Sequence, residues 1–166
     1  MDIQATLKNQ YHAALAMLRQ TIERCPDDLW TAGDHPRTYW RIAYHALFFT
    51  HLYLQPNEET FRPWEGHRED CQFLEALPWP PHDQPKIADP YTKQEMLDYW
   101  RFCDAMIDEA VDRLDLDAPD CGFGWYDMPK LDHQLMNIRH VQQHAGQLAE
   151  RVYPAGVDLD WVGRVP

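Results

Sequence analysis

Four separate stretches of this chain repeat apolar side chains at alternating steps of three and four residues, the spacing of one face of an α-helix. They cover residues 2–25, 37–54, 93–115 and 130–153. Pro26 ends the first stretch, and Pro154 with Gly156 stops the fourth. Thr92 and Glu95 have the spacing of a capping box before the third. Because no strand pattern competes, the sequence predicts an all-α protein built as a four-helix bundle.

Three of the stretches have one continuous apolar face each, while residues 37–54 are apolar on almost every side. A helix of the latter kind lies centrally or against several partners. The predicted apolar faces are Ile3, Leu7, Tyr11, Ala14, Leu18, Ile22 and Cys25; Met96, Trp100, Cys103, Ile107, Ala110 and Leu114; and Leu131, Leu135, Ile138, Val141, Ala145, Leu148 and Val152.

The stretch between the second and third predicted helices is long and rich in proline, especially from Gln55 to Pro90. A tight hairpin needs far less chain. We therefore predict one long crossover connection, with the second and third helices parallel. Within it, residues 65–77 (EGHREDCQFLEAL) are expected to form a short helix over one end or side of the bundle. There are no internal repeats, so residues 1–166 are predicted to form one domain.

Composition narrows the possible partners and locations. Aromatic residues make up 13% of the chain, which suits a compact core with a lined pocket. The formal net charge of −12 and the lack of any basic run argue against binding nucleic acid or an anionic membrane. No apolar stretch is long enough to span a membrane. The first residues, MDIQATLKNQYH, lack a signal-peptide core, so we predict a cytoplasmic protein.

The histidines carry the most specific chemical signal. Among the nine in the chain, His140 and His144 have the spacing at which two side chains share one helix face, about 5–6 Å apart. Two imidazoles so placed can ligate one metal ion at about 2.0–2.1 Å each. With this many histidines the spacing also arises by chance, so two surface histidines remain the alternative.

Position along the helices strengthens the metal interpretation. His140 and His144 straddle the middle of the fourth predicted helix, and His45 is at the middle of the second. The centres of packed bundle helices lie at similar depth. Phe49 and Leu52 are one or two turns from His45, so His45 is expected to face inward. The sequence therefore predicts one divalent metal ion held by His45, His140 and His144.

Neighbouring polar residues have weaker assignments. His51 is on another helix face from His45. His133 lies about 10 Å along the axis from His140 and is expected at the pocket mouth rather than on the metal. Gln147 and Asn137 are candidates to hydrogen-bond near the site. Gly146 indicates either a close approach by backbone or ligand, or a tolerated flaw in the helix.

The segment NIRHVQQHAGQLAERV resembles the H-x-x-x-H-x-G-Q signature of the DinB/YfiT-like superfamily, and WRIAYHALFFTHLYL resembles the helix carrying that family's first histidine. The resemblance covers nearly the whole chain. It implies a four-helix bundle with a three-histidine metal site, often zinc or nickel, and frequently a homodimer. The family includes thiol-dependent transferases and isomerases. This chain differs from shorter members in its stretch from Gln55 to Pro90.

Several functions are compatible with such a site. Three protein ligands leave one position open, as in catalytic zinc sites, so we expect a catalytic rather than a structural metal. The leading hypothesis is a metal-dependent enzyme of the thiol S-transferase type that acts on a small molecule and a low-molecular-weight thiol. A metal-dependent hydrolase and a non-catalytic protein that binds metal or a small ligand in a stress response are the alternatives. The sequence identifies no catalytic residue and no general base.

Overall fold

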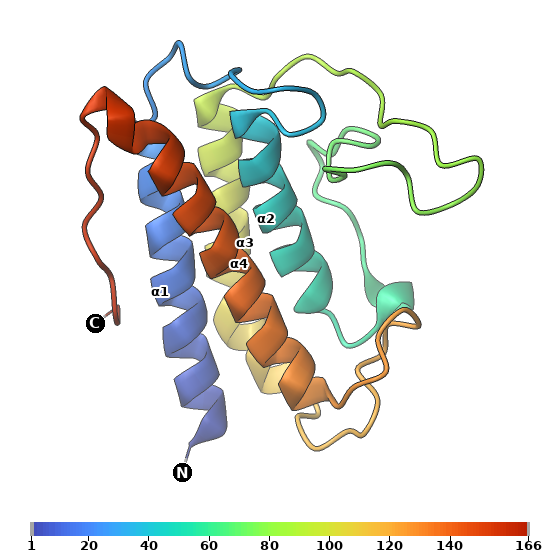
Figure 1. The fold of residues 1–166 in the computed structure, drawn as a ribbon. Helices are drawn as coiled ribbons and strands as arrows, with labels where there is room; N and C mark the ends of the chain where they lie inside the picture. The colour runs from blue at the N-terminus through green and yellow to red at the C-terminus, as the bar shows by residue number, and fades with distance from the viewer. Residues whose placement is uncertain (1, 166) are drawn as a thin grey trace.

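The computed structural model describes residues 2–165, which contain four α-helices, two short 3₁₀-helices and no strand (Figure 1). The α-helices are α1 (Ile3–Arg24), α2 (Tyr39–Tyr53), α3 (Lys93–Arg113) and α4 (Lys130–Val152). The 3₁₀-helices are η1 (Glu58–Thr60) and η2 (Tyr153–Ala155). The predicted all-α four-helix bundle is confirmed. No helix in this part of the chain combines the length and hydropathy required to cross a membrane.

Local sequence signals explain where α3 and α1 begin. The Thr92 hydroxyl accepts from the Glu95 amide at 3.1 Å, and the Glu95 carboxylate accepts from the Thr92 amide at 2.7 Å. This reciprocal capping box satisfies amide groups that have no partner within α3. At α1 the Asp2 carboxylate accepts from the Ala5 amide in the same way. The predicted capping box is therefore present.

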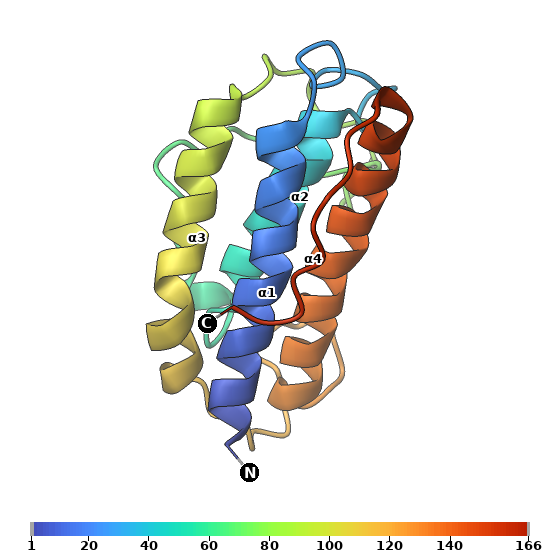
Figure 2. The same cartoon turned by 90° about the vertical axis from the view of Figure 1, so that its left-hand side faces the viewer.

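The helices are arranged so that α1 and α2 each pack against both α3 and α4. In Figure 1, α1 and α4 run upward while α2 and α3 run downward. Antiparallel packing of α2 on α4 brings the middles of these two helices to the same depth. Figure 2 shows the C-terminal segment, residues 156–165, returning beside α1, where the Gln20 side chain bonds the Asp160 main chain in both directions at 2.9 Å.

Residues 54–92, here called the α2–α3 connection, are bound near both ends of the bundle. The Lys130 ammonium group, at the start of α4, donates to the Pro56 carbonyl at 2.7 Å. At the other end, the Trp30 indole donates to the Tyr91 carbonyl at 2.6 Å. Between these points the connection covers one side of α2 (Figure 1).

A buried arginine holds the middle of this connection. Arg41 of α2 is 0% exposed, and its guanidinium donates to the carbonyls of Cys71, at 3.2 Å, and of Asp70 and Lys86, each at 3.0 Å. The helix predicted over residues 65–77 is wrong, because this stretch forms turns. Asp70 has a φ of 65°, in the left-handed region that interrupts a right-handed helix. The carbonyls of Asp70 and Cys71 accept from Arg41 of α2 instead of from amides four residues further along the chain.

The first half of α4 also differs from the predicted apolar face. Leu135 is 48% exposed, whereas His133, Gln134 and Asn137 are fully buried. The Tyr11 hydroxyl of α1 donates to the Gln134 side chain at 2.7 Å and accepts from the Asn137 amide at 2.9 Å. This polar network rotates the buried face relative to the apolar stripe. From Val141 onward, the predicted face is buried.

Candidate metal centre

The structure brings His45 of α2 together with His140 and His144 of α4. The Nε2 atoms of His45 and His140 are 2.9 Å apart, and those of His140 and His144 are 3.1 Å apart. One ligand atom from each residue lies within 4.8 Å of the other two. Nitrogens bound to one tetrahedral ion at about 2.0–2.1 Å are roughly 3.3 Å apart, so the triad is close to the geometry of a metal site.

In two of the three histidines, the Nδ1 atom, which faces away from the triad, is hydrogen-bonded to a neighbouring group. His45 Nδ1 donates to the Gln72 carbonyl of the α2–α3 connection at 2.6 Å, and His144 Nδ1 donates to the Gln147 side chain at 3.0 Å. A neutral imidazole has one proton, so these bonds leave the Nε2 lone pairs of both rings directed toward His140. The expected hydrogen bond of Gln147 is therefore present at the site.

The surroundings of the two ring nitrogens of His140 test whether a cation fits between the three histidines. The Nδ1 atom of His140 is buried and has no hydrogen-bond partner among residues 2–165. If Nδ1 has the proton, three Nε2 lone pairs face one another. If Nε2 has it, a buried lone pair is left at Nδ1. The second arrangement is costly, because a buried polar atom has no partner. In the first arrangement, a cation between the three Nε2 atoms removes the repulsion of their lone pairs. The triad could therefore hold a metal ion.

The electrostatic environment keeps the three rings neutral at pH 7. Burial is the main cause that lowers the pKa of His45 well below its ordinary value, and His144 and His140 lower it further. Burial, then His144, lowers the pKa of His140 to about 4. The pKa of His144 is lowered by burial and by Arg37, although Gln147 opposes the shift. Neutral imidazole is the form that binds metals.

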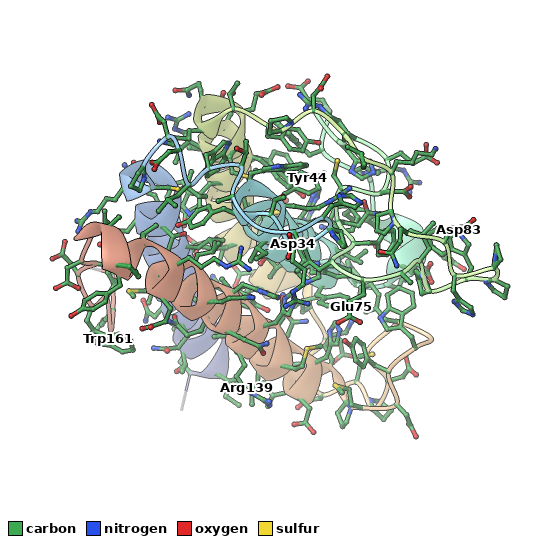
Figure 3. All side chains as sticks on the ribbon, turned by 45° about the horizontal axis from the view of Figure 1, so that its top comes forward. Asp34, Tyr44, Glu75, Asp83, Arg139 and Trp161 are labelled. Carbon is green, nitrogen blue, oxygen red and sulfur yellow. The ribbon has the colours of Figure 1, made fainter. Side chains whose placement is uncertain are left out.

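A cavity of about 890 Å³ opens onto the triad. Its walls come from α2, α4, the α2–α3 connection and the loop before α4. Residues 72–79 of the connection form the roof, and Glu75 is labelled in Figure 3 on the side of that connection facing α4. The side chains lining it are mainly apolar, with charges only at Arg37, Glu58 and Glu75. The lining residues are Arg37, His45, Phe48, Phe49, Leu52, Glu58, Gln72, Phe73, Leu74, Glu75, Ala76, Pro78, Trp79, Trp125, His140, Gln143 and His144.

Other sequence candidates lie away from this centre. His51 is buried against the Tyr99 hydroxyl and the rings of Phe61 and Phe102. His133 does not line the cavity mouth as expected, because it is enclosed by the rings at Tyr53, Phe123 and Tyr126.

Two residues of α4 near the triad have other roles than expected. Asn137 bonds Tyr11 rather than the triad. A Cβ atom at Gly146 would meet nothing within 4 Å, so no close packing requires glycine there.

No sequence pattern indicated the roof of the cavity or the carbonyl that orients His45. Both belong to irregular chain whose contacts are with residues distant in sequence, so no periodicity marks them. The available signal was Arg41, a lone arginine in a helix that is apolar on almost every side. Such a residue requires buried acceptors, which only the neighbouring connection can supply.

Together these features define a four-helix bundle with a histidine triad at the floor of an aromatic cavity. A comparison of the chain with protein-family models, curated proteins and solved structures found no match.

Removing the Gln147 side chain is expected to weaken metal binding. The Gln147→Ala variant loses the acceptor that fixes the orientation of His144, and such losses reduce metal affinity by about 10- to 100-fold. The affinity for zinc is measured by competition with a chromophoric chelator. Gln143→Ala is the matched control, since Gln143 is on the same helix and lines the cavity without bonding the triad. Equal affinities of the two variants would contradict the role given to Gln147.

Proposed function

We propose that His45, His140 and His144 hold one divalent metal ion, zinc or nickel, and that the protein is a metal-dependent enzyme of the thiol S-transferase type. The observation that carries this proposal is the cavity above the triad. It has room for a small molecule and includes the carboxylates of Glu58 and Glu75 in its lining. A purely structural metal site would be closed by a fourth protein ligand and would have no need of such a space.

The chemistry follows from the donors and the lining. His45, His140 and His144 would hold the divalent ion, which when bound would lower the pKa of a thiol beside it and so favour the nucleophilic thiolate. The aromatic walls limit access of water to the sulfur and accommodate an apolar electrophile. The thiol proton passes to one carboxylate of the cavity lining, that of Glu58 or that of Glu75. The sulfur forms a bond to the electrophilic carbon, and the leaving group departs with the electrons of the bond that breaks.

The resemblance to the DinB/YfiT-like superfamily supports the same proposal. The H-x-x-x-H-x-G-Q residues of this chain are His140, His144, Gly146 and Gln147. In the structure, the two histidines meet His45, and Gln147 bonds His144. Three members of the motif therefore have a physical role at one site.

The test compares the parent protein with His144→Ala, each purified without a metal-affinity tag. The parent is expected to contain one equivalent of zinc or nickel by elemental analysis and to conjugate cysteine or glutathione to monochlorobimane. Chloride is the leaving group in this reaction. His144→Ala is expected to lose at least about 100-fold of the metal-dependent rate while circular dichroism shows an intact helical fold. His82→Asn, altered in an exposed turn, is the matched control.

Three outcomes count against the proposal. Equal rates in His144→Ala and the parent would separate activity from the triad. Metal-dependent hydrolysis of esters without thiol conjugation would assign a hydrolase instead. Stoichiometric metal with neither activity would assign a binding protein.

A further inference from the structure

The residues that line the cavity are spread along the length of α2, with the triad between the two ends. Arg37 lies just before the first turn of α2, whereas Leu52 lies in its last turn, about 20 Å away along the helix axis. The triad is near the middle, because His45 is in the central turns of α2. The lining of the cavity therefore extends along most of α2, to both sides of the triad.

At one end of the cavity, the main chain of Arg37 is held in place and its guanidinium is available to a ligand. The main chain of Arg37 is fixed on both sides, since its amide donates to the Asp34 carbonyl at 2.7 Å and its carbonyl accepts from Arg151 at 3.0 Å. The guanidinium lies 3.6 Å from the carboxylate of Glu75 in the roof. Their side chains are 44% and 85% exposed, so this pair is weak and is readily exchanged for another anion. Figure 3 labels two residues in contact with Arg37, namely Asp34, whose carbonyl bonds the Arg37 amide, and Glu75.

The opposite end is aromatic. Phe49 and Leu52 of α2 line it, together with Trp125, whose indole donates to the Tyr53 hydroxyl at 3.4 Å. Trp125 and Trp79 are each 50% exposed, although both are large and apolar. The carboxylate of Glu58 lies in the same lining and repels an anion from this end.

We propose that the cavity binds a small organic carboxylate, with its carboxylate paired to Arg37 and its apolar body extended over the triad toward Phe49, Leu52 and Trp125. This inference deepens the proposed function, because it names the substrate class for the same site. A planar guanidinium binds a carboxylate through two parallel hydrogen bonds, an arrangement that a neutral amide does not offer. Arg37 is thus a specificity-determining residue. The Glu75 carboxylate pairs with Arg37 until the carboxylate of the ligand replaces it.

The experiment measures binding rather than turnover. Phenylacetate and its neutral analogue phenylacetamide are titrated by calorimetry into the parent protein, both after chelator treatment and after loading with zinc. We expect phenylacetate to bind at least about tenfold more tightly than phenylacetamide in both states. Arg37→Met retains the apolar stem and is expected to abolish this preference. Glu75→Gln removes the competing anion and is expected to tighten phenylacetate binding severalfold. Arg139→Met, on an exposed part of α4, is the control.

The outcomes separate this inference from the proposed function. If the preference survives in Arg37→Met and disappears when zinc is removed, the carboxylate binds the ion and the inference is wrong. Equal binding of acid and amide, or binding of neither, also overturns it. Failure of thiol conjugation leaves the preference in chelator-treated protein intact. Conversely, conjugation by Arg37→Met at the parent rate with an uncharged electrophile leaves the proposed function standing whatever the titrations show.

Discussion

The Arg41→Met variant is expected to unfold with a free energy about 3–5 kcal/mol lower than the parent. Methionine fills much of the volume of arginine but donates no hydrogen bond, so the carbonyls of Cys71 and Lys86 lose their donor and that of Asp70 keeps only the Phe73 amide. Each buried carbonyl left unpaired costs about 1–3 kcal/mol. Metal affinity is expected to fall as well, because Gln72, whose carbonyl orients His45, follows Cys71 directly.

Urea denaturation followed by circular dichroism measures the first effect, and a zinc titration measures the second. Arg139→Met is the control, since this arginine is exposed on α4 and its replacement should change the unfolding free energy by less than about 0.5 kcal/mol. Arg41→Lys, which retains the charge but not the planar set of donors, should fall between parent and Arg41→Met. A change below about 1 kcal/mol in Arg41→Met would mean that water or other groups satisfy the three carbonyls.

Acid is expected to destabilise the metal-free protein steeply between pH 6.5 and 4. Burial lowers the pKa of both His51 and His133 from 6.5 to about 4, and Lys130 contributes to the shift at His133. Both rings are thus neutral in the folded chain at a pH where the unfolded chain binds protons. Their contribution is complete above pH 6.5 and is lost as the pH falls toward 4, by roughly 3 kcal/mol from each histidine.

His133→Phe provides the measurement for one of these groups. The ring of His133 lies 5.0 Å from that of Phe123 in a stacked arrangement that phenylalanine can preserve. Unfolding free energies measured at several pH values should show a slope lower by about 1.4 kcal/mol per pH unit in the variant over this range. His82→Asn, a substitution at an exposed residue of the α2–α3 connection, is the control. Identical slopes in His133→Phe and the parent would show that His133 takes up no proton on unfolding.

The parts of this protein that were predictable from sequence are those governed by local rules. Capping of α3 by Thr92 and Glu95 depends on residues three apart, and His140 and His144 share a face because they are four apart. To predict that His45 contacts these two histidines, one further assumption was needed, that the centres of packed helices in a bundle lie at equal depth. That step succeeded because α2 and α4 are neighbours.

Non-local hydrogen bonds account for what was missed. Leu135 fits an apolar stripe, but the Tyr11 hydroxyl on the facing helix selects Gln134 and Asn137 for burial instead. The stretch from residue 65 to 77 has an acceptable helical composition, yet Arg41 and His45 bind its carbonyls from outside. In both cases polar side chains on another element determine the local structure, and one sequence does not reveal such pairings.

The bond between His45 and the roof is made to a main-chain carbonyl, that of Gln72. A carbonyl is supplied by every amino acid, so the orientation of this histidine does not depend on which side chain occupies position 72. The roof residues from Phe73 to Trp79 line the cavity but belong to neither helix that bears the triad. Substitutions in this stretch can therefore change the shape and lining of the cavity while the three histidines keep their positions on α2 and α4.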